Sequence, residues 1–192
     1  MKIVSLMGSP RKKGNTAAIN NHFCTAAENL GAQVKTYVLN ELDYRGCQGC
    51  MACKTKLDKC VLEDDLTQVL DAVRDADILV LGSPVYFWDV TSQLKGFLDR
   101  TYSYLVPNFH SQPVKSRLAP GKKLVMILAQ GQPDETMFTN IFPKFEYFFK
   151  MQGFSESHLI RACGVREAGE VEKQEHVMEL AEKLAQDLCN GH

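Results

Sequence analysis

Hydrophobic residues along the chain alternate between short continuous runs and helically spaced stripes. Largely apolar runs at 3–6, 78–81 and 124–128 are typical of strands buried on both faces, and the segments 34–39 and, more weakly, 154–162 also predict strands. Between the runs, apolar residues three or four positions apart predict helices over 16–30, 63–73, 94–101, 136–151 and 177–188. Strands that alternate with helices in this way predict an α/β protein with a five-stranded open parallel sheet, right-handed crossovers and helices on both faces.

Turn-forming residues follow three of these strands. Gly8 comes after the first strand, Gly82 after the third and Gln130-Gly131 after the fourth. In a parallel sheet with strand order 2-1-3-4-5, these three strands are neighbours, and ligands bind at the carboxyl ends of the strands. We therefore expect the three loops to converge on one ligand. The sequence shows no internal repeat or linker, so residues 1–192 are expected to form a single domain.

The loop at 8–17, GSPRKKGNTA, joins the first strand to the first helix. Ser9, Asn15 and Thr16 can donate hydrogen bonds from their side chains, and Arg11 can clamp an anion. Asn15 or Thr16 is also expected to cap the helix, whose N-terminus attracts phosphate. The loop matches neither the Walker A pattern nor GxGxxG, so it favours a terminal monophosphate such as that of FMN. A solvated basic loop is the alternative.

Aromatic residues dominate the loop at 83–93, SPVYFWDVTSQ, which follows the third strand. Free backbone N–H and C=O groups beside Tyr86, Phe87 and Trp88 suit a flavin ring, which has a polar edge and an apolar plane. The alternative is that these aromatics cover the sheet edge or a subunit contact. The neighbouring phosphate loop favours the flavin interpretation.

Four cysteines lie close together within GCQGCMACKTKLDKC, at 46–60: Cys47, Cys50, Cys53 and Cys60. Three cysteines at intervals of three wrap a short loop around an iron–sulfur cubane, as in bacterial ferredoxins, and the fourth lies nearby. The pattern therefore favours a [4Fe–4S] cluster. Free thiols and a zinc site are the alternatives, although structural zinc sites usually have two separated C-x2-C pairs. Cys24, Cys163 and Cys189 are isolated and are expected to be buried hydrophobes.

Charge and composition exclude several classes of partner. Lysine plus arginine total 22 and aspartate plus glutamate total 23, so nothing indicates binding to nucleic acid or to an anionic membrane. There is no apolar run of membrane length and no signal-peptide pattern, so a cytoplasmic location is expected. A reducing cytosol argues against pairing the seven cysteines in a disulfide framework.

Three stretches, GSPRKKGNTA, GCQGCMACKTKLDKC and GSPVYFWDVTSQLKGFLDR, together resemble the iron–sulfur flavoprotein group of the NADPH-dependent FMN reductase family, over about residues 1–131. The resemblance implies a flavodoxin-like three-layer sandwich with a cysteine-rich loop at 44–62. It implies an FMN phosphate bound by Ser9, Arg11, Asn15, Thr16 and Ala17. It also implies isoalloxazine contacts from Pro84, Val85, Tyr86, Phe87, Gln130 and Gly131. Homodimers or homotetramers are implied, in which one subunit's cluster approaches another's flavin.

Three functions are therefore compared. The first is an FMN-dependent electron-transfer oxidoreductase with a [4Fe–4S] cluster, which takes electrons from ferredoxin or NAD(P)H. The second is a clusterless NAD(P)H-dependent FMN or quinone reductase. The third is a non-catalytic binding module with the cysteine loop as a zinc clip.

A few further residues carry weaker expectations. Trp88, Tyr102 and Tyr104 can line an acceptor site, although helix packing is the stronger expectation for the two tyrosines. Lys95 and Arg100 are expected on a solvated or paired helix face. The aromatic segment 138–149 can mark a contact surface. The segment 105–121 follows no recognisable pattern.

Overall fold

The computed structural model describes residues 1–190 and contains one five-stranded parallel sheet in the order β2-β1-β3-β4-β5. The strands are β1 (Lys2–Met7), β2 (Gln33–Val38), β3 (Ile78–Pro84), β4 (Lys122–Ala129) and β5 (Phe154–Ala162). The fold class and the strand order expected from the sequence are both confirmed. Since β1, β3 and β4 are adjacent, the loops that follow them leave the same edge of the sheet.

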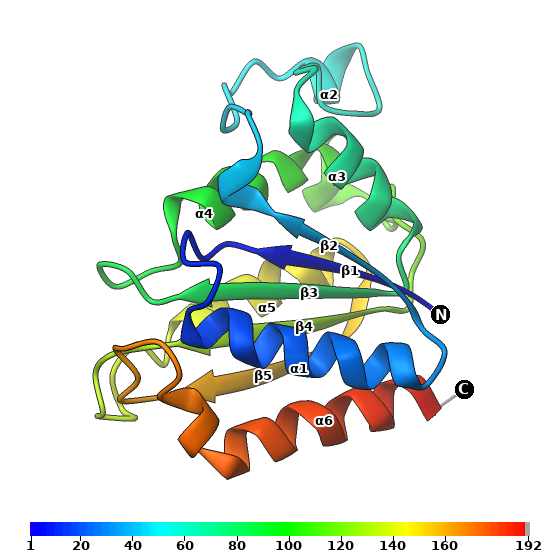
Figure 1. Ribbon diagram of the computed structural model, residues 1–192. Helices are drawn as coiled ribbons and strands as arrows, with labels where there is room; N and C mark the ends of the chain where they lie inside the picture. Colours follow the sequence, from blue (N-terminus) through cyan, green and yellow to red (C-terminus); the bar gives the residue numbers. More distant parts are fainter. Residues whose placement is uncertain (191–192) are drawn as a thin grey trace.

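Helices cover both faces of the sheet (Figure 1). One face carries α1 (Asn15–Asn29) and α6 (Glu175–Asn190), and the other carries α3 (Asp65–Asp75), α4 (Ser92–Arg100) and α5 (Ile141–Met151). The short elements are α2 (Ala52–Thr55) and the 3-10 turns η1 (Leu39–Glu41), η2 (Thr101–Tyr104), η3 (Phe109–Ser111) and η4 (Val171–Lys173). The result is the expected three-layer sandwich.

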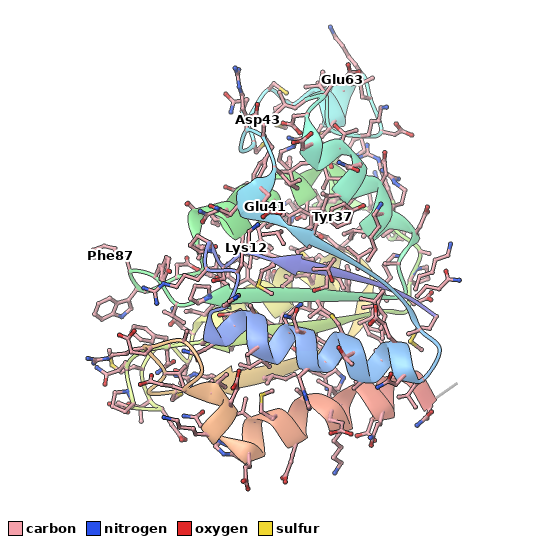
Figure 2. The ribbon with its side chains drawn as sticks, viewed as in Figure 1. Lys12, Tyr37, Glu41, Asp43, Glu63 and Phe87 are labelled. Carbon is pink, nitrogen blue, oxygen red and sulfur yellow. The ribbon has the colours of Figure 1, made fainter. Side chains whose placement is uncertain are left out.

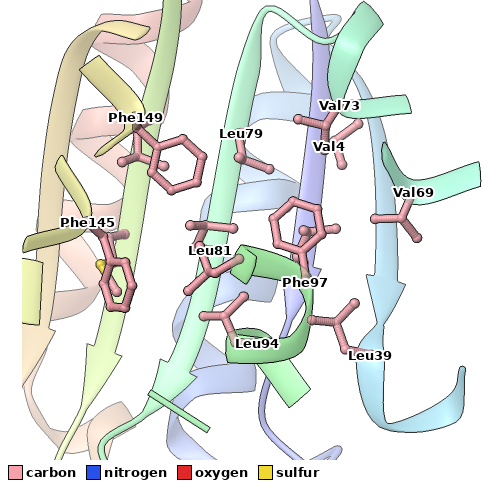
Figure 3. Close-up of a cluster of buried hydrophobic side chains, with 14 of the residues drawn as sticks. Val4, Leu39, Val69, Val73, Leu79, Leu81, Leu94, Phe97, Phe145 and Phe149 are labelled. Atoms are coloured by element: carbon pink, nitrogen blue, oxygen red, sulfur yellow. The ribbon is translucent and has the colours of Figure 1, made fainter. Parts of the chain in front are cut away.

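Two hydrophobic clusters hold the layers together, because alternate residues of each strand point to opposite faces. On β1, Ile3 belongs to the cluster under α1 and α6, whereas Val4 belongs to the cluster under α3, α4 and α5. In the second cluster, Leu79 and Leu81 of β3 pack with Phe97 of α4 (Figure 3). Burial on both faces explains why the central strands are continuous apolar runs in the sequence.

Some boundaries differ from the sequence-based expectations. The third strand does not stop at Gly82 but continues to Pro84, which pairs with Ala129 of β4. Helix α5 begins at Ile141 rather than 136, and Pro143 lies in its first turn, where a missing N–H costs little. Leu39 leaves the second strand and enters η1.

Helices α1 and α3 begin differently. Asp64 is the N-cap of α3, and its carboxylate and the Thr67 hydroxyl form a capping box. For α1, the expectation of an Asn15 or Thr16 cap is wrong. Gly14 is the N-cap and offers no side-chain acceptor, so the N-terminus of α1 is open to another group.

The cysteine-rich loop at 44–62 stands beside the β2 edge of the sheet, between η1 and α3, and includes α2 (Figure 1). No helix within residues 1–190 combines the length and the apolar character needed to cross a membrane.

Candidate functional site

A cavity of about 230 Å³ lies at the carboxyl ends of the central strands. We call it the carboxyl-end cavity. It is lined by Ser9, Arg11, Gly14, Asn15, Thr16, Pro84, Val85, Tyr86, Ala129, Gly131, Val165, Arg166 and Ala168. The loops after β1, β3 and β4 therefore converge, as the sequence predicted, and a fourth segment, after β5, joins them.

One end of the carboxyl-end cavity is built from the loop before α1. Ser9, Asn15 and Thr16 are all buried. The Arg11 N–H donates to Ser9 Oγ over 3.2 Å, and the Gly14 N–H donates to the Arg11 carbonyl over 3.1 Å. This tight loop places hydroxyl and amide groups beside the open N-terminus of α1. Such an arrangement can hold a phosphate, because both the free N–H groups and the helix dipole favour an anion.

The segment after β5 was not anticipated from the sequence. Asn15 Nδ2 donates to the Glu167 carbonyl over 2.8 Å, and Asn15 Oδ1 accepts from the Val171 N–H at 3.1 Å. Arg166 Nε donates to the Gly131 carbonyl over 3.0 Å. The sequence signal was only positional, because 163–171 follows a parallel strand on the side where ligands bind.

The predicted site residues divide into two groups. Ser9, Arg11, Asn15, Thr16, Pro84, Val85, Tyr86 and Gly131 line the carboxyl-end cavity, whereas Ala17, Phe87 and Gln130 do not. Ala17 is buried in the first turn of α1. The Gln130 amide oxygen accepts from Arg161 Nη2 at 2.6 Å, and Phe87 is 98% exposed.

The aromatic turn after β3 projects from the molecule beyond the cavity (Figure 2). Phe87 and Trp88 have φ values of 43° and 68°, which bulky residues rarely adopt. The Trp88 ring packs edge-on against Phe138, with 5.3 Å between ring centroids, and Lys144 Nζ pairs with Asp89 at 2.6 Å. Trp88 is therefore placed at an exposed contact rather than inside the cavity.

A second hollow, of about 60 Å³, is lined by all four clustered cysteines. We call it the cysteine hollow. Its other lining residues are Gln48, Gly49, Met51, Val61, Leu62, Arg100, Tyr102 and Ser103. Gly49 and Met51 have φ values of 63° and 59°, so the chain turns sharply around the thiols. The Gly49 N–H donates to Cys47 Sγ over 3.5 Å.

The thiols of the cysteine hollow lie close enough to affect one another. Burial raises the pKa of the Cys53 thiol, and Cys60 and Cys47 add to this, whereas the positive charges of Lys54 and Arg117 oppose it. Within residues 1–190, no three histidine, cysteine or acidic side chains are arranged so that they could hold a metal ion as they stand.

Residues 105–117, which the sequence did not explain, support the cysteine loop. Arg117 Nη2 donates to the Cys53 carbonyl over 2.9 Å, and Arg117 Nη1 donates to the Ser103 and Leu105 carbonyls, both at 2.7 Å. Lys54 Nζ donates to the Tyr102 carbonyl over 2.6 Å. The loop is thus tied to the segment after α4 through two half-buried cations.

Other expectations have mixed outcomes. Tyr104 is fully buried and donates to the Leu70 carbonyl over 2.7 Å, so it packs in the core, whereas Tyr102 lines the cysteine hollow. Lys95 pairs with Asp99 on an exposed face. Arg100 is also paired, with Asp64, but it is buried rather than solvated.

The isolated cysteines are not all alike. Cys24 is buried as expected, and burial raises the pKa of its thiol to about 11. Cys163 and Cys189 are only half-buried.

Comparison with known proteins gives a family and several relatives. A family model described as flavodoxin-like fold, Flavodoxin_2, matches residues 1–188. An iron–sulfur flavoprotein of Archaeoglobus fulgidus is 33% identical over 135 residues, which cover 70% of this chain and 58% of the relative. An iron–sulfur flavoprotein of Methanocaldococcus jannaschii is 37% identical over 101 residues, which cover 53% of this chain and 52% of the relative. The chain thus spans little more than half the length of these relatives.

A solved structure with a similar fold is the FMN-dependent NADH-azoreductase of Bacillus anthracis in complex with FMN. Its TM-score is 0.72 at 15% identity, and the match covers 98% of this chain and 100% of that chain. At this identity the likeness shows the fold alone.

Proposed function

Because the chain belongs to the Flavodoxin_2 family, of flavodoxin-like fold, we propose that it is an FMN-dependent oxidoreductase that passes electrons from a reduced donor to an acceptor. One observation carries the proposal. The carboxyl-end cavity joins the open N-terminus of α1 to the backbone of Pro84, Val85 and Tyr86. The first end suits a phosphate and the second suits the polar edge of a flat ring, as the two ends of FMN require. The names of the curated relatives support the same cofactor.

The proposal assigns roles along the carboxyl-end cavity. The FMN phosphate accepts hydrogen bonds from Ser9, Asn15 and Thr16, from the backbone of Ala17 in the first turn of α1, and from Arg11. The isoalloxazine lies against Pro84, Val85, Tyr86 and Gly131, with Gln130 supporting Gly131 and Phe87 at the open mouth. The bound flavin supplies the redox chemistry, and the protein holds it and tunes its potential.

We propose that Cys47, Cys50, Cys53 and Cys60 bind a [4Fe–4S] cluster. The donor set fits, because four thiolates are what such a cluster takes and all four cysteines line one hollow. The Gly49 N–H already donates to Cys47 Sγ, which is the kind of contact that tunes a cluster. Lys54 and Arg117 nearby offset part of the negative charge of several thiolates.

The electron donor in this proposal is NAD(P)H or a ferredoxin, and the protein works in the cytoplasm as a homodimer or homotetramer. A groove of about 690 Å³ beside α5, lined in part by Phe145, Tyr147 and Phe148, supports self-association. Tyr147 is 63% exposed and Phe148 is 48% exposed, and neighbouring exposed aromatic side chains are typical of a contact surface. Four neighbouring free thiols favour a reducing compartment.

A clusterless NAD(P)H-dependent FMN or quinone reductase is the second candidate. It is favoured by the absence, within residues 1–190, of any three side chains already set for a metal ion. In that case the cysteine loop carries thiols alone. A zinc clip on a non-catalytic module is the remaining alternative.

Anaerobic purification followed by flavin, iron, sulfide and zinc analysis separates the three functions. The proposed function predicts one FMN per chain, together with a broad absorbance at about 400 nm that bleaches on reduction. Flavin without iron would favour the clusterless reductase. A colourless chain that holds zinc and takes up no FMN would overturn both oxidoreductase proposals.

A further inference from the structure

Arg100, at the end of α4, is a buried cation whose role the proposed function does not explain. The residue is 1% exposed. Among the described residues that line the cysteine hollow, Arg100 is the single one with a charged side chain. A buried guanidinium is costly unless it is paired and fully hydrogen-bonded. The hydrogen-bond partners of the Arg100 guanidinium therefore indicate its structural role.

Two of its nitrogens hold the ends of the cysteine segment. Arg100 Nη1 donates to both carboxylate oxygens of Asp64, at 2.6 and 2.5 Å, and to the Arg45 carbonyl at 3.3 Å. Arg100 Nη2 donates to the Leu62 carbonyl over 3.0 Å. Arg45 and Leu62 flank the segment 46–61, which carries all four clustered cysteines. The guanidinium thus ties both ends of this segment to α4.

The third guanidinium nitrogen of Arg100, Nε, differs from the other two in its hydrogen bonding. Within residues 1–190, Arg100 Nε has no hydrogen-bond partner, although it is shielded from solvent. Buried donors in folded proteins nearly always have a partner, and an arginine cannot shed its proton to avoid the cost. The cysteine hollow, which Arg100 shares with four thiols, offers acceptors of the required kind once the thiols are deprotonated.

We propose that Arg100 is a positioning residue for the cysteine site, which fixes the ends of the loop and offers its Nε–H and positive charge to the thiolate-bound group. This inference rests on the proposed metal-binding role of the cysteines. Hydrogen bonds to sulfur and nearby positive charge stabilise the reduced, more negative state of a cluster, so they raise its reduction potential. Asp64 offsets part of that charge, so the pair sets the potential together.

Three variants test the inference. Asp64→Asn keeps a good helix cap but unmasks the charge of Arg100, so the reduction potential of the reconstituted iron–sulfur site should rise. Adding Arg100→Met to Asp64→Asn removes the charge and the donor, so the potential should fall below that of Asp64→Asn, with no charge left buried alone. Lys95→Met removes an exposed charge from the same helix and should leave the potential unchanged.

Co²⁺ affinity of the apo thiols, read from thiolate-to-cobalt absorbance, gives a second measurement for any variant that does not take up iron. The double variant should bind Co²⁺ about 10- to 100-fold more weakly than the wild type, because supporting residues typically contribute that much. FMN affinity reports the fold separately, since Arg100 does not line the carboxyl-end cavity.

Potentials and Co²⁺ affinities that stayed at the wild-type values in both Asp64→Asn and the double variant would overturn the role of Arg100 and leave the proposed cluster standing. A wild-type chain that binds FMN but neither iron nor Co²⁺ would overturn both the cluster and this inference. A wild-type chain without FMN would instead overturn the proposed function at its other site.

Discussion

Asn15 Nδ2 donates a hydrogen bond to the Glu167 carbonyl oxygen over 2.8 Å, and this hydrogen bond joins the first turn of α1 to the loop after β5. The same side chain accepts a hydrogen bond from the Val171 N–H. A residue expected to cap its own helix is thus used to hold a segment more than 150 positions away. This contact closes one wall of the carboxyl-end cavity.

Asn15→Ala should therefore weaken both folding and FMN binding. The change leaves the buried Val171 N–H without its partner, which should cost about 1–3 kcal/mol of unfolding free energy. Urea unfolding and FMN titration measure the two effects. Asn21→Ala, at an exposed position of α1, is the control and should change neither quantity. Full stability in Asn15→Ala would show that the loop after β5 is held by other contacts.

Arg11→Ala should weaken FMN binding by about 1.5–3 kcal/mol, because a charge-assisted hydrogen bond to the phosphate is lost. Fluorescence quenching on FMN titration measures the change. Lys13→Ala removes an equal charge from the same loop, outside the cavity lining, and should have little effect. Equal affinities for wild type and Arg11→Ala would place the phosphate elsewhere.

Cys50→Ser should lose iron but keep FMN, because the cysteine hollow and the carboxyl-end cavity share no lining residue. Iron, sulfide and flavin content per chain after anaerobic purification gives the result. Cys163→Ser changes a half-buried cysteine outside the hollow and should retain all three. If Cys50→Ser kept its full iron content, Cys50 would not be a ligand.

Stability should depend on pH through the Arg100–Asp64 pair. Burial opposes ionisation of Asp64, but hydrogen bonds from Arg100, Arg45 and Leu66 outweigh it and hold the pKa of the carboxyl below its usual value. A carboxyl with a lowered pKa stabilises the fold above its unfolded pKa of about 3.9, and this contribution is lost as pH falls through the folded value.

Asp64→Asn should therefore be less stable than wild type at pH 7, by about 3–5 kcal/mol, because it leaves a buried guanidinium without its counter-ion. The difference should shrink as pH falls below about 4. Urea unfolding across that range measures it. Asp99→Asn breaks the exposed pair with Lys95 and should cost only about 0–1 kcal/mol. If the difference in unfolding free energy between wild type and Asp64→Asn stayed constant with pH, the lowered pKa assigned to Asp64 would be contradicted.

The sequence by itself determined the layered architecture. Strands buried on both faces must be continuously apolar, and helices that cover a sheet must repeat their apolar residues every three or four positions, so both leave a local pattern. Gly8, Gly82 and Gly131 marked three loops at one edge of the sheet. The spacing of the four clustered cysteines likewise showed a local feature before any contact was known.

Only the tertiary structure decided how the site is supported. Asn15 reaches Glu167, Arg100 reaches Arg45 and Leu62, and Arg117 reaches the Cys53 carbonyl. Periodicity along the chain records whether a position is buried, but it does not record which distant backbone group a polar side chain meets. The partner that a polar side chain meets depends on the path of loops whose own sequences carry no period. The residues that support the carboxyl-end cavity and the cysteine hollow therefore became visible only in the folded chain.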